Sequence, residues 1–188
     1  MYGHNTKGFE IERKRGIMMK DVVFVYNTSC FYEIVILNYF MSVCNCDMVF
    51  CSLDGKAIRV MEGFSVNVDM SLEELEKESI RSFIVPGGKI SEVDNADVKA
   101  YLQELKKRNV VIGGICAGVD LLDNAGILCD VKSTHSTDED FVNDKNIITA
   151  RANAYVDFAI EVAKKLELFA DENDLQETID FWKYFKRV

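Results

Sequence analysis

The sequence predicts an α/β domain built on a mostly parallel, doubly wound β-sheet with helices on both faces. Short apolar, β-rich runs alternate along the chain with longer amphipathic segments, which is the pattern of βαβ units. A length of 188 residues fits one domain, and 48% hydrophobic with 28% charged residues is typical of a globular protein. With no internal repeat and no Pro/Gly/Ser-rich linker, residues 19–188 are expected to form a single domain.

Residues 1–18 are expected to be a disordered tail without a function of its own, including His4. The stretch is mixed in charge and has no apolar core of a secretory signal, and either Met18 or Met19 could be the natural first residue. No later apolar run approaches the ~18 residues of a membrane span. We therefore expect a cytoplasmic protein.

The first half of the chain is expected to contain three buried strands, a hairpin, one longer helix and one short helix. Apolar runs rich in β-branched and aromatic residues predict strands buried on both faces, and an apolar pattern of helical length follows the first of them. Residues 57–68 look like a hairpin or edge strands around Gly63. Ser71 and Glu74 have the spacing of a capping box, which predicts a short helix there. The strands and the helix are expected, in chain order, at residues 22–26, 31–41, 48–52 and 82–85.

The second half is expected to continue the alternation and to close with two helices. Amphipathic periodicity predicts its helices, and Gly126 supplies a residue able to end one of them with φ > 0. Helices are expected at residues 95–108, 117–125, 155–168 and 175–185. Strands are expected at residues 110–115, 132–134 and 147–149.

The sharpest chemical pattern is Gly-Ile-Cys-Ala-Gly at residues 114–118, where an apolar strand meets a helix. This is the pattern of a nucleophile elbow with Cys116 in place of serine, and Gly114 and Gly118 would relieve collisions in its tight turn. The helix N-terminus favours an anion, and lowering a thiol pKa from about 8.5 to about 5.5 would raise the thiolate fraction at pH 7 roughly 30-fold. The alternative is a buried, inert cysteine at a packing point.

A second pattern, Val-Pro-Gly-Gly at residues 85–88, ends the preceding strand at the same carboxyl edge of the sheet. It contains Pro86, the only proline in the chain, followed by Gly87. The backbone N–H groups of Gly88 and Ala117 could form an oxyanion hole for a reaction at Cys116. The alternative is an ordinary turn.

Two further side chains are candidates for acid–base chemistry. His135 is the only histidine outside the tail, and it serves catalysis only if the fold brings it near Cys116; otherwise it is a surface or structural histidine. Glu33 follows the carboxyl end of the first strand. A carboxyl beside a thiolate should have a raised pKa and could donate a hydrogen bond to sulfur. By spacing alone, Glu33 could equally be a solvated helix residue.

Composition limits the partners. The net charge of −9 argues against nucleic acid and against an anionic membrane surface, which leaves small molecules. The six cysteines, without an export signal, are expected to be reduced thiols. Cys44 and Cys46 lack the second ligand pair that a zinc site needs, so we expect no metal.

These residues together resemble the ThiJ/PfpI family, within the class I glutamine amidotransferase-like superfamily. The likeness runs from about Lys20 to the C-terminus and rests on the following segments: 22–26 with Glu33, 83–88, 113–118, 121–128, 133–135 and 147–151. The resemblance implies a flavodoxin-like fold, a homodimer and no added cofactor. It also implies that Glu33 hydrogen-bonds the Cys116 thiol and that His135 lies near the site.

The resemblance implies a cysteine-dependent hydrolase or lyase acting on small reactive carbonyl or amide compounds, of glyoxalase or deglycase type. One alternative is a non-catalytic redox-stress sensor or chaperone that uses oxidation of the same cysteine. Another is an intracellular peptidase or amidase, or a glutamine amidotransferase-like protein. Ala117, where the peptidase branch has histidine, argues against a peptidase. The absence of a His-x-Glu pair argues against a glutamine amidotransferase-like protein. Residues 151–153 replace a glycine-containing turn common in the family, and Asp138 is only a possible carboxylate partner for His135.

Overall fold

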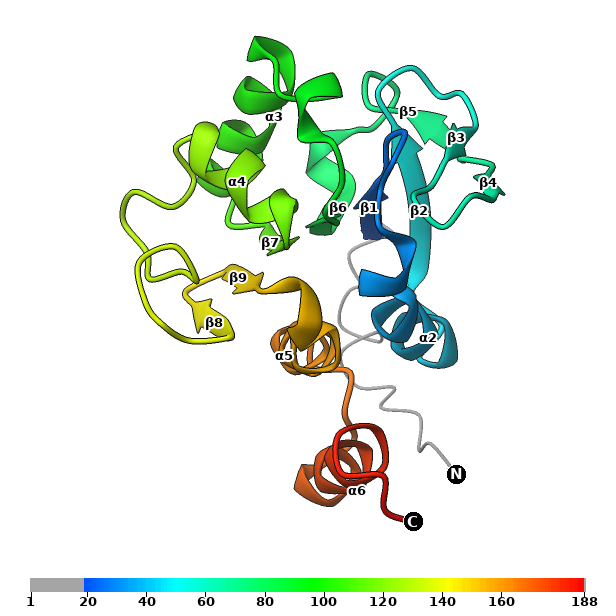
Figure 1. The fold of residues 1–188 in the computed structure, drawn as a ribbon, viewed down its shortest axis with the longest axis vertical. Coiled ribbons are helices and arrows are strands. Elements are labelled where there is room, and N and C mark those ends of the chain that lie inside the picture. The colour runs from blue at the N-terminus through cyan, green and yellow to red at the C-terminus, as the bar shows by residue number, and fades with distance from the viewer. Residues whose placement is uncertain (1–18, 188) are drawn as a thin grey trace.

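A seven-stranded sheet forms the centre of the molecule (Figure 1). The computed structural model describes residues 19–187, so the tail expected at residues 1–18 lies outside the described residues. The strands are β1 (Lys20–Phe24), β2 (Asp47–Ser52), β5 (Met70–Ser71), β6 (Ile80–Val85), β7 (Val111–Ile115), β8 (Phe141–Asp144) and β9 (Ile147–Ala150).

The strand order is β5-β2-β1-β6-β7-β9-β8, and only β8 pairs antiparallel to its neighbour. The five central strands follow the order β2-β1-β6-β7-β9, which is the flavodoxin-like order and confirms the expected fold. A separate two-stranded hairpin consists of β3 (Ile58–Arg59) and β4 (Ser65–Val66), as expected from residues 57–68.

Helices cover both faces of the sheet (Figure 1). The α-helices are α2 (Val35–Val43), α3 (Ala96–Lys107), α4 (Ala117–Asn124), α5 (Tyr155–Lys165) and α6 (Glu172–Trp182). Short 3-10 turns are η1 (Phe31–Glu33), η2 (Lys77–Ser79), η3 (Ile90–Glu92) and η4 (Ala152–Ala154). Helices α3 and α4 pack on one face, α2 and α5 on the other, and α6 lies outside the second layer.

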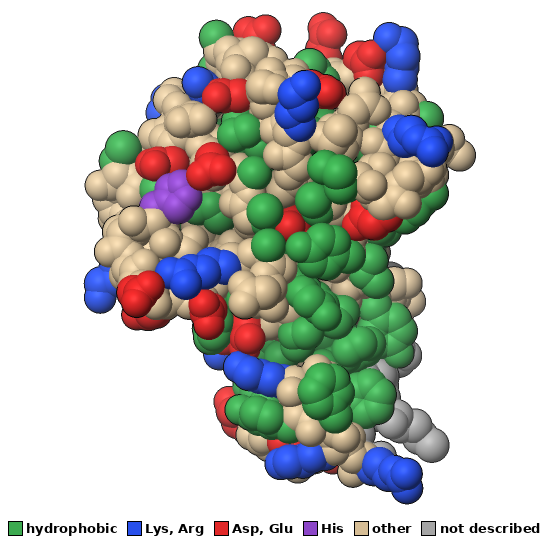
Figure 2. Space-filling view, in the orientation of Figure 1, with side chains coloured by type: hydrophobic (Ala, Val, Ile, Leu, Met, Phe, Trp, Pro, Cys, Tyr) green, Lys and Arg blue, Asp and Glu red, His purple; other side chains and the backbone are tan. Residues whose placement is uncertain are grey.

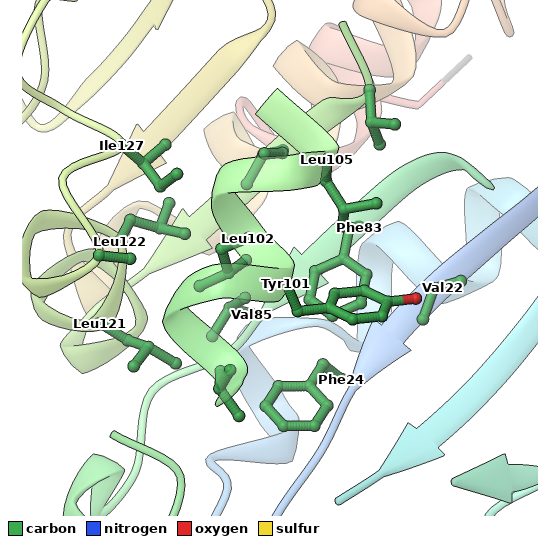
Figure 3. Packing of buried hydrophobic residues seen from close by; sticks show 14 of the residues in the cluster. Val22, Phe24, Phe83, Val85, Tyr101, Leu102, Leu105, Leu121, Leu122 and Ile127 are labelled. Carbon is green, nitrogen blue, oxygen red and sulfur yellow. The ribbon is translucent and has the colours of Figure 1, made fainter. Parts of the chain in front are cut away.

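Alternation along the strands divides the core into two layers. In β1, Val22 and Phe24 belong to the cluster under α3 and α4, while Val23 belongs to the cluster under α2 and α5. Figure 3 shows the first layer, in which Leu102 and Leu105 of α3 face Phe83 of β6 and the neighbouring strand residues. Because every central strand is buried on both faces, its sequence is almost wholly apolar.

Two of the expected elements are wrong. No α-helix begins at Ser71, although the capping hydrogen bonds do form: the Ser71 N–H and hydroxyl each donate to Glu74 Oε2 at 2.8 Å. The chain continues as a turn because Leu72 and Leu75 are drawn into the core instead of propagating a helix. Residues 132–134 are a loop and not a strand, because β8 occupies the edge of β9.

Other differences concern only element ends. The helix expected at residues 31–41 is divided into η1 and α2, and β1 ends two residues before the expected limit. Helix α6 begins at Glu172 because the Asp171 side chain caps it, accepting from the Asp174 N–H at 2.9 Å. Within residues 19–187, no helix is both long and apolar enough to cross a membrane.

Candidate active site

The candidate site lies where three adjacent strands end. Glu33 follows β1, the Pro86–Gly88 turn follows β6, and Cys116 follows β7. These strands are neighbours and parallel, so their carboxyl ends share one edge of the sheet. The chain winds to opposite faces on the two sides of this point, which is where sheets of this kind place their ligand sites.

Cys116 occupies a strained turn between β7 and α4. Its backbone has φ 56° and ψ −130°, a conformation that costs a non-glycine residue about 1–3 kcal/mol. Its N–H donates to the Ala150 carbonyl at 3.0 Å. A Cβ on Gly118 would lie 2.2 Å from the Val85 carbonyl oxygen, and one on Gly114 would lie 2.6 Å from Leu122 Cδ1. The two glycines therefore allow α4 and β6 to approach the turn closely.

Gly87 brings the predicted side chains together. A Cβ on Gly87 would lie 2.9 Å from Cys116 Sγ and 2.8 Å from Glu33 Oε2. The Gly87 N–H donates to Glu33 Oε2 at 2.7 Å, and the Tyr26 hydroxyl donates to the Pro86 carbonyl at 2.9 Å. The thiol, the carboxyl and the turn thus meet at a residue that has no side chain.

Gly88 shapes the other side of the same turn. It has φ 143°, and a Cβ there would lie 2.6 Å from the Thr28 carbonyl oxygen. Its own carbonyl accepts from the Ile90 N–H at 3.0 Å, where η3 begins. The Ala117 N–H hydrogen-bonds Cys116, at the start of α4. Gly88 therefore packs against the backbone of residues 28–29, and Ala117 is the donor that contacts Cys116.

Glu33 is a buried acid, not the solvated residue that spacing alone allows. It is 1% exposed, and this burial raises the pKa of its carboxyl above the ordinary value. Hydrogen bonds from the Gly87 N–H and from the Cys116 and Tyr32 side chains oppose the rise. A carboxylate whose pKa is raised is a stronger base, so beside a thiol it is suited to exchange a proton with it.

The thiol pKa differs from the sequence-based expectation. Burial raises the pKa of the Cys116 thiol above its ordinary value, and the negative charge of Glu33 raises it further. The Ala117 N–H at the helix start lowers it, but less than these two effects raise it. The thiol and the carboxyl therefore titrate as a coupled pair. When Glu33 is protonated it carries no charge, so it no longer raises the pKa of the Cys116 thiol by its charge.

His135 pairs with α4. Its Nε2 lies 3.1 Å from Asp120 Oδ1 and its Nδ1 lies 3.2 Å from Asp123 Oδ2. Figure 2 shows the histidine at the surface, bordered by acidic side chains. Asp138, considered as its partner from the sequence, pairs instead with Arg151 at 3.0 Å.

Three neighbours of the site were not singled out from the sequence. Asp120 lies one helical turn after Cys116, and its charge raises the thiol pKa. Tyr32 precedes Glu33 and hydrogen-bonds it, while its ring contacts Tyr155. Cys30 is the residue before η1. The i, i+4 spacing from Cys116 could have indicated Asp120. Among residues 19–187, no three His, Cys, Asp or Glu side chains are grouped so as to hold a metal ion.

Comparison with known proteins places these features in context. The model of the DJ-1/PfpI family matches residues 19–165. The chain is 29% identical over 145 residues to the uncharacterized protease YoaZ of Bacillus subtilis, which covers 66% of this chain and 69% of that protein. It is 28% identical over 74 residues to a deglycase of Thermococcus kodakarensis; that match covers 38% of this chain and 45% of the deglycase, less than half its length.

Solved structures share the fold over almost the whole chain. A DJ-1 superfamily protein from Agrobacterium tumefaciens superposes with a TM-score of 0.79 at 25% identity, covering 90% of this chain and 100% of that one. A thiJ/pfpI family protein from Bacillus anthracis superposes with a TM-score of 0.80 at 23% identity, covering 90% and 93%.

Proposed function

The chain belongs to the DJ-1/PfpI family, and from that premise we propose that it is a cysteine-dependent enzyme acting on small reactive carbonyl compounds, of glyoxalase or deglycase type. The observation that carries the proposal is the junction at Gly87, where Cys116 Sγ and the Glu33 carboxyl both occupy the space that a Cβ on this residue would need. The deglycase relative supports the same class of chemistry.

The first step is addition of the thiol to an aldehyde. Glu33 takes the thiol proton while Cys116 sulfur bonds to the carbonyl carbon, so that no free thiolate has to accumulate despite the raised thiol pKa. The carbonyl π electrons move to oxygen, and the N–H groups of Ala117 and Gly88 stabilise the oxyanion. Glu33 then returns the proton to that oxygen and is again a carboxylate.

The second step moves hydrogen between neighbouring carbons. For methylglyoxal, Glu33 removes the proton of the former aldehyde carbon to give an enediolate, the hydroxyl proton on that carbon passes to the former ketone oxygen, and Glu33 returns its proton to the former ketone carbon. The result is a lactate thioester on Cys116, which water hydrolyses to lactate and the free thiol. The aldehyde carbon is oxidised and the ketone carbon is reduced, so water is the only co-reactant.

We assign His135 a positioning role. His135 contacts the carboxylate of Asp120, whose charge raises the Cys116 pKa. It also contacts Asp123, and this pairing holds the loop before β8 against α4. Proteolysis is the weaker candidate, because Ala117 offers no base next to the nucleophile.

The test is production of lactate from methylglyoxal by the reduced protein and by two cysteine variants. Cys116→Ser should lose lactate formation, while Cys129→Ser, at an exposed cysteine in the loop after α4, should retain it. Lactate formation at the wild-type rate by Cys116→Ser would overturn the proposal. A casein digest in parallel distinguishes a peptidase.

A further inference from the structure

A second thiol, Cys30, lies beside the nucleophile. The Cys30 N–H donates to the Gly87 carbonyl at 2.9 Å, and Gly87 is the residue whose Cα faces Cys116 Sγ. Cys30 also immediately precedes η1, the turn that carries Glu33, and its carbonyl accepts from the Glu33 N–H at 3.4 Å. Both thiols are partly accessible. Cys30 thus contacts Gly87 through its backbone and Cys116 approaches it through its side chain, and the two thiols are near enough for a charge on Cys116 to raise the Cys30 pKa.

The remaining cysteines occupy other parts of the fold. Cys44 and Cys46 follow α2 at its far end, where Cys44 Sγ donates to the Leu168 carbonyl and Cys46 Sγ accepts from Arg81. Cys51 is buried within β2, and Cys129 is exposed in the loop after α4. Of the six cysteines, all within the described part of the chain, Cys30 is the one that the fold places with Cys116.

We propose that Cys116 and Cys30 form a dithiol pair that reduces hydroperoxides, with Cys116 attacking the peroxide and Cys30 resolving the product. Cys116 sulfur bonds to one peroxide oxygen as the O–O bond breaks, and the other oxygen takes the thiol proton and leaves as water or an alcohol. This produces a sulfenic acid on Cys116. Cys30 sulfur then bonds to Cys116 sulfur, the S–O bond breaks, and water leaves. Two thiols are oxidised to a disulfide, one hydroperoxide is reduced, and a small dithiol restores the pair.

The surroundings of Cys30 favour this order of events. Burial, followed by the charges of Glu33 and Cys116, raises the pKa of the Cys30 thiol to about 11, so it is not the first thiol to react. As a sulfenic acid, Cys116 can no longer become a thiolate, so it no longer opposes ionisation of the Cys30 thiol.

The experiment exposes the reduced full chain to hydrogen peroxide and maps its peptides without reduction. The wild type should lose two of its six thiols and yield a Cys30–Cys116 peptide that dithiothreitol reverses. In Cys30→Ser and Cys30→Ala, the sulfinic form of Cys116 should accumulate at least about tenfold faster, because no thiol traps the sulfenic acid. Cys46→Ser is the matched control and should behave as the wild type.

Two results would overturn the inference: conversion of wild-type Cys116 to sulfinic acid with no Cys30–Cys116 peptide, or identical oxidation in the wild type and both Cys30 variants. The inference goes beyond the carbonyl chemistry and fails separately from it. A protein that forms the disulfide but no lactate contradicts only the proposed carbonyl activity, and a protein that forms lactate but no disulfide contradicts only the dithiol pair.

Discussion

Cys116 and Glu33 control each other's protonation. Burial raises the pKa of both groups, and the charge of the carboxylate raises the thiol pKa further. An enzyme that relied on a free thiolate would be slowed by this arrangement. An enzyme whose carboxylate accepts the thiol proton during the attack benefits from the same arrangement, because a carboxylate with a raised pKa is a stronger base.

Glu33→Gln should therefore lower dicarbonyl turnover by roughly 100-fold or more, since the glutamine amide cannot accept the thiol proton. The measurement is kcat for lactate formation from methylglyoxal. Glu172→Gln is the control: Glu172 is exposed at the start of α6, outside the site, so its loss should leave kcat within about twofold. Equal kcat values for Glu33→Gln and the wild type would exclude Glu33 as the base.

Asp120→Asn should lower the Cys116 thiol pKa, because it removes a negative charge that raises it. The shift should be smaller than that of Glu33→Gln, since the Asp120 side chain is 54% exposed and water screens it. Asp123→Asn is the matched control, as Asp123 pairs with the same imidazole from the next turn of α4. The thiol pKa is read from the pH dependence of Cys116 alkylation, and equal shifts in the two variants would contradict the assignment.

At this scale, the sequence predicted which side chains lie together at the site but not their electrostatic balance. Cys116, Glu33 and Gly87 could be inferred because an elbow motif and the ends of parallel strands are local patterns. The raised thiol pKa could not, since it depends on burial and on the distance to Glu33. The partners of His135 also could not be predicted, because they depend on how the loop before β8 packs against α4.

The strand–turn–helix unit β7–Cys116–α4 is the element that sets the geometry. Its strain at Cys116 persists because β6, α4 and β9 all pack against the turn. Gly118 is the tightest point, with the Val85 carbonyl oxygen only 2.2 Å from where a Cβ would be.

Gly118→Ala should destabilise the fold by about 3 kcal/mol, because rigid backbone lies on the opposing side. Gly126→Ala is the control. Gly126 has φ 71°, but an added Cβ would meet only Cys129 Sγ, at an ordinary contact distance of 3.9 Å, so only the left-handed backbone penalty of about 1–2 kcal/mol applies. Urea unfolding monitored by circular dichroism measures both. A smaller loss for Gly118→Ala than for Gly126→Ala would show that the close approach at the elbow is not structural.

Secondary structure was predicted wrongly where tertiary packing or strand pairing, and not the local sequence pattern, determines the conformation. The Ser71–Glu74 capping bonds form without a helix, since Leu72 and Leu75 are needed in the core. Strand β8 was missed because its sequence, Phe-Val-Asn-Asp, is half polar; it is an edge strand held by pairing with β9. The buried strands were found because burial on both faces leaves an unmistakable apolar run.

For the whole molecule, alternating strands and helices were enough to predict the layers, but not the outer surface. Hydrophobic side chains gather over α2 and towards α6 in Figure 2. The exposed ones include Tyr32, Val35 and Tyr39 around α2, and Met61 and Phe64 of the β3–β4 hairpin. No sequence pattern distinguishes such residues from core.

We expect this apolar surface to be the contact of a homodimer. Sedimentation velocity should show twice the 21.4 kDa chain mass, and Val35→Glu should shift the protein to one chain mass by burying a charge at the contact. A wild type that sediments as a monomer at every concentration would contradict the expected dimer.

The coupling of Cys116 to Glu33 is tested most directly by the rate of iodoacetamide alkylation at each of the six cysteines as a function of pH, in the wild type and in Glu33→Gln. The wild-type thiol pKa of Cys116 is raised, in part by the Glu33 charge, so the variant should titrate at lower pH. Its Cys116 should therefore react faster below the wild-type pKa and equally fast above both pKa values, while Cys129 should not change. Identical Cys116 profiles in the two proteins would contradict the account.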